Sequence, residues 1–487
     1  MLLLHIIKEL FCMPYYSDLN SHLFTQFYSK WENEINKSEE LNAPLCAPVY
    51  ENAVLLPLRP RTDVSVQNVC CEGGVCAQDG TFITGLTRAL DSRNPDWSCK
   101  RGYEIPDQVN FRDETVMYGG VLIAHFGHTL LDSMSRMWWW VKNRDQKIKI
   151  VFLRIPGQKK VYDCFLQAAG LSETDWEIID EPTRFSKLIV PDEAMFAVSM
   201  KAHKDWLLFF DLISESAKKK CRPNTYKKIY LTRRQLPESE GVNEEYYEDF
   251  YAQRGYKIIA PETLPFEEQI NYISNAEEIV CPMGTLSHFA VFAQHDAKLT
   301  ILLRVASSTI LPQIIINRIC SNNWYIVEAC VTPLPTSHSH SFSIYAPTKY
   351  FRSYLDSRNI PYSMEELWDL QIPDALYVDY FRKYTDAYSQ PKRFKLIKKA
   401  DMFDVLNSLN RTFSDRSLSR NDFETDYETV KANNRALRQD LNTARNKLYR
   451  AEKELAQIYN SKAWKCITRY RHSLVYKLFQ RIAHLFR

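Results

Sequence analysis

Two histidines and an aspartate lie close together in the segment His125-Phe-Gly-His128-Thr-Leu-Leu-Asp132. On an α-helix, positions separated by three, four and seven residues share one face, so both imidazoles and the carboxylate would lie side by side. An imidazole can deprotonate a hydroxyl near neutral pH, and a neighbouring carboxylate orients the ring and stabilises its cation. The spacing predicts that His128 is a catalytic base with Asp132 as its partner. A divalent-metal site and structural histidines in a Trp-rich core are alternatives.

A second set of polar residues follows strands expected later in the chain. Arg233 comes at the end of an apolar run, and Gly284 precedes Thr285 and Ser287 at an expected helix start. Backbone N–H groups, hydroxyls and the positive helix end can hold a diphosphate, and an arginine fork adds a fixed countercharge. His288 follows closely enough to reach a phosphate or a sugar. Together these residues predict an anion site at the carboxyl edge of parallel strands.

The elements that must position these residues alternate between apolar runs and helical periods, which is typical of parallel α/β sheets. The first series lies before about residue 215 and the second after it. The pattern predicts strands at 148–153, 176–179, 188–190, 228–232, 256–259, 278–281 and 299–303, and helices at 161–169, 244–254, 265–274 and 285–293.

We therefore expect an α/β protein with two doubly wound, Rossmann-like domains and a ligand cleft between them. The expected N-terminal α/β domain covers 1–215, and the expected second α/β domain covers 216–345. A helical extension packing on this body is expected at 346–420, a coiled coil at 421–461 and a basic amphipathic tail at 462–487.

The coiled coil is predicted from ten residues at successive a and d positions of a heptad repeat, among them a polar Asn434. One long helix lying on its own domain is the alternative. The tail alternates apolar residues such as Trp464 with seven basic ones and no acidic one, which favours an anionic membrane surface over a docked terminal helix. The segment 421–461 therefore predicts self-association, and 462–487 predicts a peripheral membrane contact.

The composition limits the possible functions. Only 13 of 487 residues are glycine, and the chain has neither a GxGxxG nor a GxxxxGK[ST] sequence, so a glycine-rich phosphate loop is excluded. The net charge of +3 gives no argument for nucleic acid, and the tail accounts for the positive excess. The scattered cysteines favour a reducing compartment. The N-terminal apolar run contains His5, Lys8 and Glu9, which argues against a signal peptide, and it is too short for a membrane span. The expected location is the cytoplasm, at the inner face of the cell membrane.

The order of these motifs resembles glycosyltransferase family 61, whose bacterial members build capsular and related polysaccharides. His128, Asp132 and Arg136 match its first motif, and the later matches lie between about 230 and 285. Some positions differ from the family pattern, which usually has Asn at the place of His125, and His-Gly-Ala where this chain has Met283, Gly284 and Thr285. The later matches are Tyr230, Thr232 and Arg233, then Asn243 and Glu244, Glu268 and Gln269, and Gly284.

The resemblance implies a GT-B-like, inverting enzyme that moves a sugar from a nucleotide-sugar donor to an acceptor hydroxyl. The domain at 216–345 would then bind the donor nucleotide sugar, expected to be a UDP-sugar, and the domain at 1–215 would lie on the acceptor side. The donor residues would be Arg233, Asn243, Glu244, Gly284, Thr285, Ser287 and His288, whereas His125 and Arg136 would face the acceptor. Because Arg233 and the helix start would stabilise the departing diphosphate, no divalent metal is required and no cofactor is expected to bind tightly. The alternatives are a non-catalytic scaffold, which the altered loop favours, and a metal-dependent hydrolase.

Overall fold

The computed structural model describes residues 22–60, 71–83, 102–157, 163–197, 199–236, 241–305, 311–320, 323–334 and 342–389, and a few isolated positions between 439 and 454. All elements below belong to one compact unit, Met1–Thr412. The expected basic tail, most of the expected coiled coil and residues 390–420 of the expected helical extension lie outside the described residues. Among the described residues, no helix is long and apolar enough to cross a membrane.

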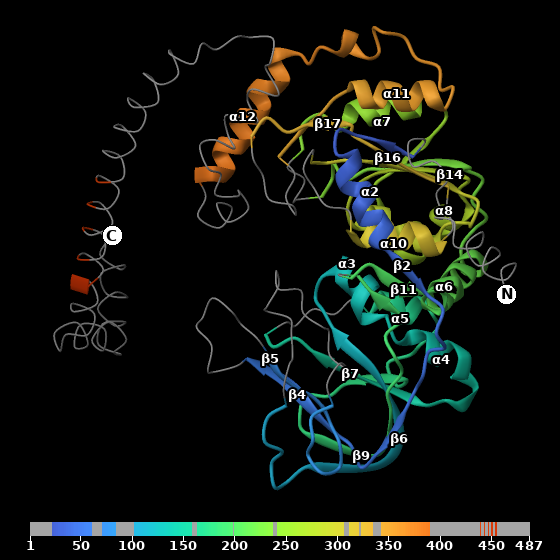
Figure 1. Cartoon of the computed structure of the whole chain (residues 1–487), viewed down its shortest axis with the longest axis vertical. Coiled ribbons are helices and arrows are strands. Elements are labelled where there is room, and N and C mark those ends of the chain that lie inside the picture. Colours follow the sequence, from blue (N-terminus) through green and yellow to red (C-terminus); the bar gives the residue numbers. More distant parts are fainter. Residues whose placement is uncertain are drawn as a thin grey trace, which may run out of the picture. The chain divides into compact units, whose positions relative to one another are not determined.

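The later half of the unit is built on a six-stranded sheet in which every pair of neighbours is parallel (Figure 1). Its buried strands are rich in Ile, Leu and Val, as strands covered on both faces are. The strand order is β1 (Leu23–Phe24), β16 (Asn323–Val327), β15 (Lys298–Leu302), β14 (Glu278–Pro282), β12 (Lys228–Leu231) and β13 (Lys257–Ile259).

Helices connect these strands in the order that the sequence predicts. They are α7 (Glu245–Ala252), α8 (Phe266–Asn275), α9 (Thr285–His288) continued by the 3₁₀ turn η7 (Phe289–Phe292), and α10 (Leu311–Cys320). The predicted strands and helices between 228 and 303 are thereby confirmed. Strand β1 was not foreseen, because two residues are too few to give a periodic signal.

The earlier half of the unit is built on a seven-stranded sheet of mixed direction. Strands β6, β7, β8 and β9 run parallel to their neighbours among these four, whereas β3, β4 and β5 are antiparallel additions. The α/β class with parallel sheets is confirmed, but this sheet is mixed where a doubly wound one was expected. The strands are β3 (Val49–Glu51), β4 (Val54–Pro60), β5 (Cys71–Cys76), β6 (Asn110–Leu122), β7 (Lys149–Arg154), β8 (Trp176–Ile178) and β9 (Thr183–Ile189).

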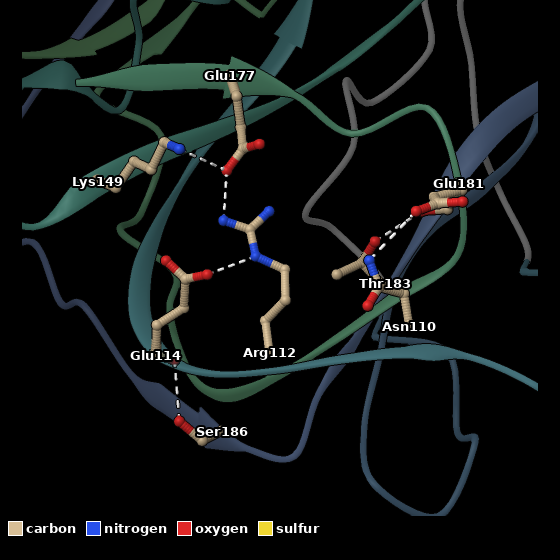
Figure 2. A network of polar contacts seen from close by, with 8 residues as sticks. All are labelled: Asn110, Arg112, Glu114, Lys149, Glu177, Glu181, Thr183 and Ser186. Carbon is tan, nitrogen blue, oxygen red and sulfur yellow. Dashed lines mark hydrogen bonds and ion pairs between the residues drawn. The ribbon is translucent and has the colours of Figure 1, made fainter. Parts of the chain in front are cut away.

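A network of charged side chains fixes the first half of the long strand β6, which leads to the histidine motif (Figure 2). Arg112 on β6 donates to Glu177 on β8 at 2.6 Å and also to Glu114. Lys149 on β7 lies 3.2 Å from the same Glu177 carboxylate. The hydrogen bond to Glu177 raises the pKa of Arg112 above its ordinary value. The network therefore ties the three neighbouring strands together at one end of the sheet.

The two sheets share one hydrophobic core. Its aromatic centre joins Phe126 and Phe165, from the earlier half, to Phe266 and Phe289, from the later half, with ring centroids 4.8–6.1 Å apart. The long helix α6 (Leu207–Lys220) packs on α8 and η7 of the later half and on α4 (Met137–Asn143) and α5 (Cys164–Ala168) of the earlier half. The packing of these aromatic rings stabilises the contact between the two halves.

Shorter elements complete the unit. The α2 helix (Tyr28–Lys37) contacts α10, and β2 (Glu39–Leu41) joins a small sheet with β10 (Met195–Phe196) and β11 (Lys201–His203). The α11 helix (Lys349–Ser357) covers β1 and β16 with Phe351, Tyr354 and Leu355, and α12 (Asp374–Ser389) contacts the two-stranded sheet of β17 (Cys330–Val331) and β18 (Ile344–Tyr345).

Candidate active site

The histidine motif lies immediately after β6, at its carboxyl end. The chain forms one short turn, α3 (Phe126–His128), and then a π-helical turn, η3 (Thr129–Ser133), where the sequence predicted a regular helix. The buried Thr129 hydroxyl donates to the Ile123 carbonyl, and the buried Ser133 hydroxyl donates to the Val121 carbonyl, both at 2.8 Å. These bonds anchor the turn to the strand end, and π turns of this kind are frequent at functional sites.

His128 and Asp132 form the pair that the sequence predicted. His128 Nδ1 lies 2.8 Å from Asp132 Oδ2. Because a carboxylate only accepts hydrogen bonds, Nδ1 carries the proton and Nε2 is the basic nitrogen of the ring. The His128 side chain is 24% exposed, so a substrate hydroxyl can approach it. The pair has the geometry of a general base with an orienting carboxylate.

His125 lies beside this pair and is exposed, with its ring centroid 4.8 Å from that of His128. Its Nδ1 accepts a hydrogen bond from the His128 backbone N–H at 3.4 Å, so His125 also caps the short turn. Arg136, in contrast, is only 2% exposed, and its guanidinium donates to the Pro191 carbonyl and to Glu193. The structure therefore places His125 at the surface of the site and Arg136 beneath it.

Three neighbouring strands of the parallel sheet present site residues at their carboxyl ends. Arg233 follows β12 by two residues, Gly284 follows β14 by two, and Arg304 follows β15 by two. Gly284 has a φ of +128°, a conformation that side chains disfavour, and a Cβ there would lie 3.3 Å from Arg304 Nη2. The glycine thus lets the Arg304 guanidinium lie close to the backbone at this strand end.

Arg304 is not among the site residues predicted from the sequence. It is 8% exposed, and burial together with the neighbouring Arg233 cation lowers its pKa to about 10. Arg304 is therefore still charged at neutral pH, and it lies close enough to Arg233 for the two cations to interact. Its position could have indicated a role, because Arg304 follows β15 by two residues, as Arg233 follows β12 by two. The residues around Arg304, however, form no recognisable motif.

Glu244 fixes the backbone at Arg233 through hydrogen bonds. Its Oε1 accepts from the Arg233 backbone N–H at 2.8 Å and from the Thr232 hydroxyl at 3.0 Å. Burial raises the pKa of Glu244 to about 7, against the opposing effect of these hydrogen bonds. Asn243 adopts a left-handed conformation, with φ +69°, and its amide donates to the Tyr345 carbonyl. Both residues line a cavity of about 420 Å³ beside the Arg233 loop.

The start of α9 is fixed by its own side chains. The buried Ser287 hydroxyl accepts from the Gly284 N–H at 3.2 Å and donates to the Gly284 carbonyl at 2.7 Å. Ser287 therefore shapes the turn that the sequence assigned to donor binding. Thr285 is partly exposed, and a Cβ at Gly127 would lie 3.0 Å from its Oγ1. This close approach brings α9 against the histidine motif.

His288 connects the two groups of site residues. Its Nδ1 lies 2.8 Å from Gln313 Oε1, to which the ring donates. Burial, together with smaller effects of the neighbouring His128, His125 and Arg304, lowers the pKa of His288 to about 4. His288 is therefore neutral at pH 7 and lies between the histidine motif and the arginine edge. The residues that the sequence assigned to two separate stretches meet at this point.

The sequence left a metal-dependent hydrolase open as an alternative. Within the described ranges, no group of three or more His, Cys, Asp or Glu side chains is arranged to hold a metal ion. The Asp132 oxygen nearest His128 is occupied by that ring, and His125 Nδ1 faces a backbone N–H. One carboxylate oxygen of Asp132 and one ring nitrogen of His125 are thus engaged within the protein itself.

Comparison with known proteins assigns this region to a family. The sequence profile of the family described as Glycosyltransferase 61 matches residues 126–300, from α3 into β15. The match contains His128, Asp132, Arg233, Gly284 and His288. No curated protein matched the chain significantly. The chain therefore carries a glycosyltransferase family 61 domain at residues 126–300, and this family implies a sugar donor and an acceptor as substrates.

Proposed function

We propose that this glycosyltransferase inverts the anomeric centre as it moves a sugar from a nucleotide sugar to a hydroxyl of a capsular-type surface polysaccharide or its lipid-linked precursor. The observation that carries the proposal is the meeting of a His–Asp pair with two buried or half-buried arginines across His288. One side has a base for the acceptor, and the other has cations for the leaving group.

On the acceptor side, His128 Nε2 removes the proton of the attacking hydroxyl as its oxygen bonds to the anomeric carbon. Asp132 holds the proton on Nδ1 and stabilises the imidazolium that forms. His125, exposed beside the pair, contacts the acceptor. An attack from the face opposite the leaving group gives inversion, because a single displacement reverses the configuration at the reacting carbon.

On the donor side, Arg233 and Arg304 bind the diphosphate, and Gly284 lets it approach the start of α9. Guanidinium forks fit phosphate oxygens in pairs, and fixed cations stabilise the negative charge that develops as the sugar leaves. We propose a UDP-sugar as donor and a reaction that needs no divalent metal, since two arginines supply the countercharge. Neutral His288 donates to or accepts from the sugar or a phosphate.

The two halves of the unit suit a GT-B-like division of labour, with the acceptor near the mixed sheet and the donor on the parallel sheet. The site residues come from both sides of the shared core. Beyond the described residues, the heptad pattern at 421–461 and the seven basic residues of 462–487 support a self-associating enzyme held at the inner face of the cell membrane.

A donor screen tests the proposal. The full chain is incubated with UDP-, GDP-, CDP- and dTDP-sugars, with and without membrane-extracted acceptor, and nucleotide release is measured. One UDP-sugar should give acceptor-dependent release, unaffected by EDTA, and a product of opposite anomeric configuration by NMR.

If calorimetry shows that no donor binds, the scaffold alternative replaces the enzyme. Loss of activity with EDTA and recovery with Mn²⁺ would exclude the metal-free reaction, and a retained configuration would exclude inversion.

A further inference from the structure

The parallel sheet has a second cavity, of about 560 Å³, at the edge opposite the donor-binding arginines. Its wall includes Lys228, Glu278 and Lys298, which stand at the amino ends of β12, β14 and β15. The same three strands carry Arg233, Gly284 and Arg304 at their other ends. We call this the distal cavity, and it is lined by Lys228, Arg254, Glu278, Lys298, Tyr325 and Arg358, among others.

Positive charge on the strand side exceeds negative charge. Lys228 and Lys298 flank Glu278 in register across the three strands, and both ammonium groups face the same oxygen, Oε1, at 3.3 and 3.9 Å. The other oxygen, Oε2, accepts from the Tyr256 hydroxyl at 2.6 Å. One carboxylate can neutralise only one of two lysines, so this row retains a positive charge.

The helix side contributes two arginines of different kinds. Arg254 is committed to the protein, since it pairs with Glu366 at 2.9 Å and donates to the Pro361 carbonyl at 2.7 Å. The Arg358 guanidinium stacks on the Tyr325 ring at 4.6 Å, and no described carboxylate forms an ion pair with it. The carbonyl end of α11 offsets roughly half a charge of Arg358, so positive charge remains.

The inner wall is built from tyrosines, which offer flat rings and hydroxyl groups. Tyr354 shares a hydrogen bond with Thr300 at 2.7 Å. Tyr251 also lines the cavity, and its buried hydroxyl has no hydrogen-bond partner among the described residues. The wall therefore offers flat aromatic surface to an occupant, with polar groups of the tyrosines at its edge.

We propose that the distal cavity binds a small phosphate monoester, between a sugar phosphate and a nucleoside monophosphate in size. The volume lies within the roughly 300–1,000 Å³ of small-molecule sites. A phosphate dianion matches the excess charge of the lysine row and Arg358, and a hydroxyl-bearing body matches the tyrosine wall. The site does not depend on the proposed transferase reaction, because none of its lining residues belongs to the donor or acceptor site.

Calorimetry on the full chain tests this inference, with glucose 6-phosphate and UMP as probes and glucose, uridine and inorganic phosphate as controls. Arg358→Gln should weaken binding of at least one probe about tenfold or more, and Lys298→Gln, at an exposed residue, should act in the same direction. Lys227→Gln is the matched control, since Lys227 lies next to Lys228 but pairs with Glu277 at 3.1 Å. Arg233→Gln should leave the same binding unchanged.

Hydrogen exchange locates the bound probe, and it remains informative if one variant folds poorly. Protection should appear in residues 356–361 and 251–256, whereas a ligand in the donor site would protect 284–288. Three results overturn the inference: no probe binds the wild-type chain, glucose or inorganic phosphate binds as tightly as the ester, or Arg233→Gln abolishes the binding that Arg358→Gln leaves intact.

Discussion

The hydrogen bond between His128 and Asp132 determines which ring nitrogen can act as a base. An aspartate can only accept from Nδ1–H, whereas an asparagine at the same place can donate to Nδ1 and shift the proton to Nε2. The catalytic role of His128 thus depends on the charge of its neighbour as well as on its position.

Asp132→Asn should therefore lower kcat about 10²-fold while leaving the KM for the donor nearly unchanged. The reason is that the variant ring presents N–H instead of a lone pair to the acceptor, and the arginine edge is untouched. Steady-state kinetics measure this, with Asp205→Asn as control, because Asp205 pairs with Lys142 at 2.6 Å away from the site. A variant whose KM rises and whose kcat holds would place Asp132 in donor binding.

His288 makes the stability of the protein depend on pH. Its pKa falls from 6.5 in the unfolded chain to about 4 in the folded one, so the unfolded state binds more protons between these values. The free energy of unfolding should decrease as pH falls from about 6.5 to 4, by up to about 3 kcal/mol. Thermal melts of wild type and His288→Gln across this range should show the difference in stability shifting in favour of wild type as pH rises. Curves that stay parallel would contradict the lowered pKa of His288.

At the scale of elements, the proposed donor site consists of residues that follow the carboxyl ends of three strands. The sheet brings Arg233, Gly284 and Arg304 to one edge because β12, β14 and β15 are neighbours and run parallel. Because Gly284 has no side chain, the Arg304 guanidinium can lie close to the backbone at the end of β14.

Gly284→Ala tests this arrangement. The new Cβ meets Arg304 at 3.3 Å, and the φ of +128° is strained for alanine, so the protein should lose about 1–3 kcal/mol of stability and the KM for the donor should rise about tenfold. Gly255→Ala is the matched control. Gly255 has a φ of +81° with open space around it, so that variant should lose stability only. Equal donor KM in both variants would contradict a diphosphate held over Gly284.

The elements that the sequence predicted well were the ones with strong periods. The strands and helices from 228 to 303 were correct because buried Ile, Leu and Val runs alternate with amphipathic segments. The antiparallel additions β3, β4 and β5 were missed, since short strands separated by irregular segments give no alternation. The π turn was missed because it depends on the hydroxyls of Thr129 and Ser133 reaching back to carbonyls on and just after β6.

The candidate site shows the same limit. The spacing of His128 and Asp132 was enough to predict their contact, because it is local to one turn. The closeness of His288 to both motifs, and the presence of Arg304, follow from the packing of two sheets against each other. Such contacts between residues far apart in the chain have no signature in a single sequence.

At the scale of the whole molecule, the shared aromatic core joins the half that carries His128 and Asp132 to the half that carries Arg233 and Arg304. Phe165 is fully buried and contacts Phe126 at 5.0 Å and Phe266 at 4.8 Å between ring centroids. A rigid core of this kind keeps the base at a constant distance from the leaving group, as positioned catalysis requires.

Phe165→Ala should therefore destabilise both halves of the unit together, by about 3–5 kcal/mol. Urea unfolding gives the magnitude, and hydrogen exchange should show faster exchange in β12 and β14 as well as in β6 and β7. Phe111→Ala, at a position 55% exposed on β6, should change stability by less than about 0.5 kcal/mol. Exchange that increases in the earlier half alone would mean that the two sheets unfold independently.

The most direct test of the central claim is the rate of acceptor-dependent nucleotide release by His128→Ala at saturating donor. The rate should fall about 10²-fold or more, with donor affinity within about twofold of wild type by calorimetry, because the variant removes the base and leaves the arginine edge intact. His295→Gln, on a ring that faces the Cys320 carbonyl, should retain wild-type rates. Near-wild-type transfer by His128→Ala would contradict the assignment of the base and, with it, the proposed mechanism.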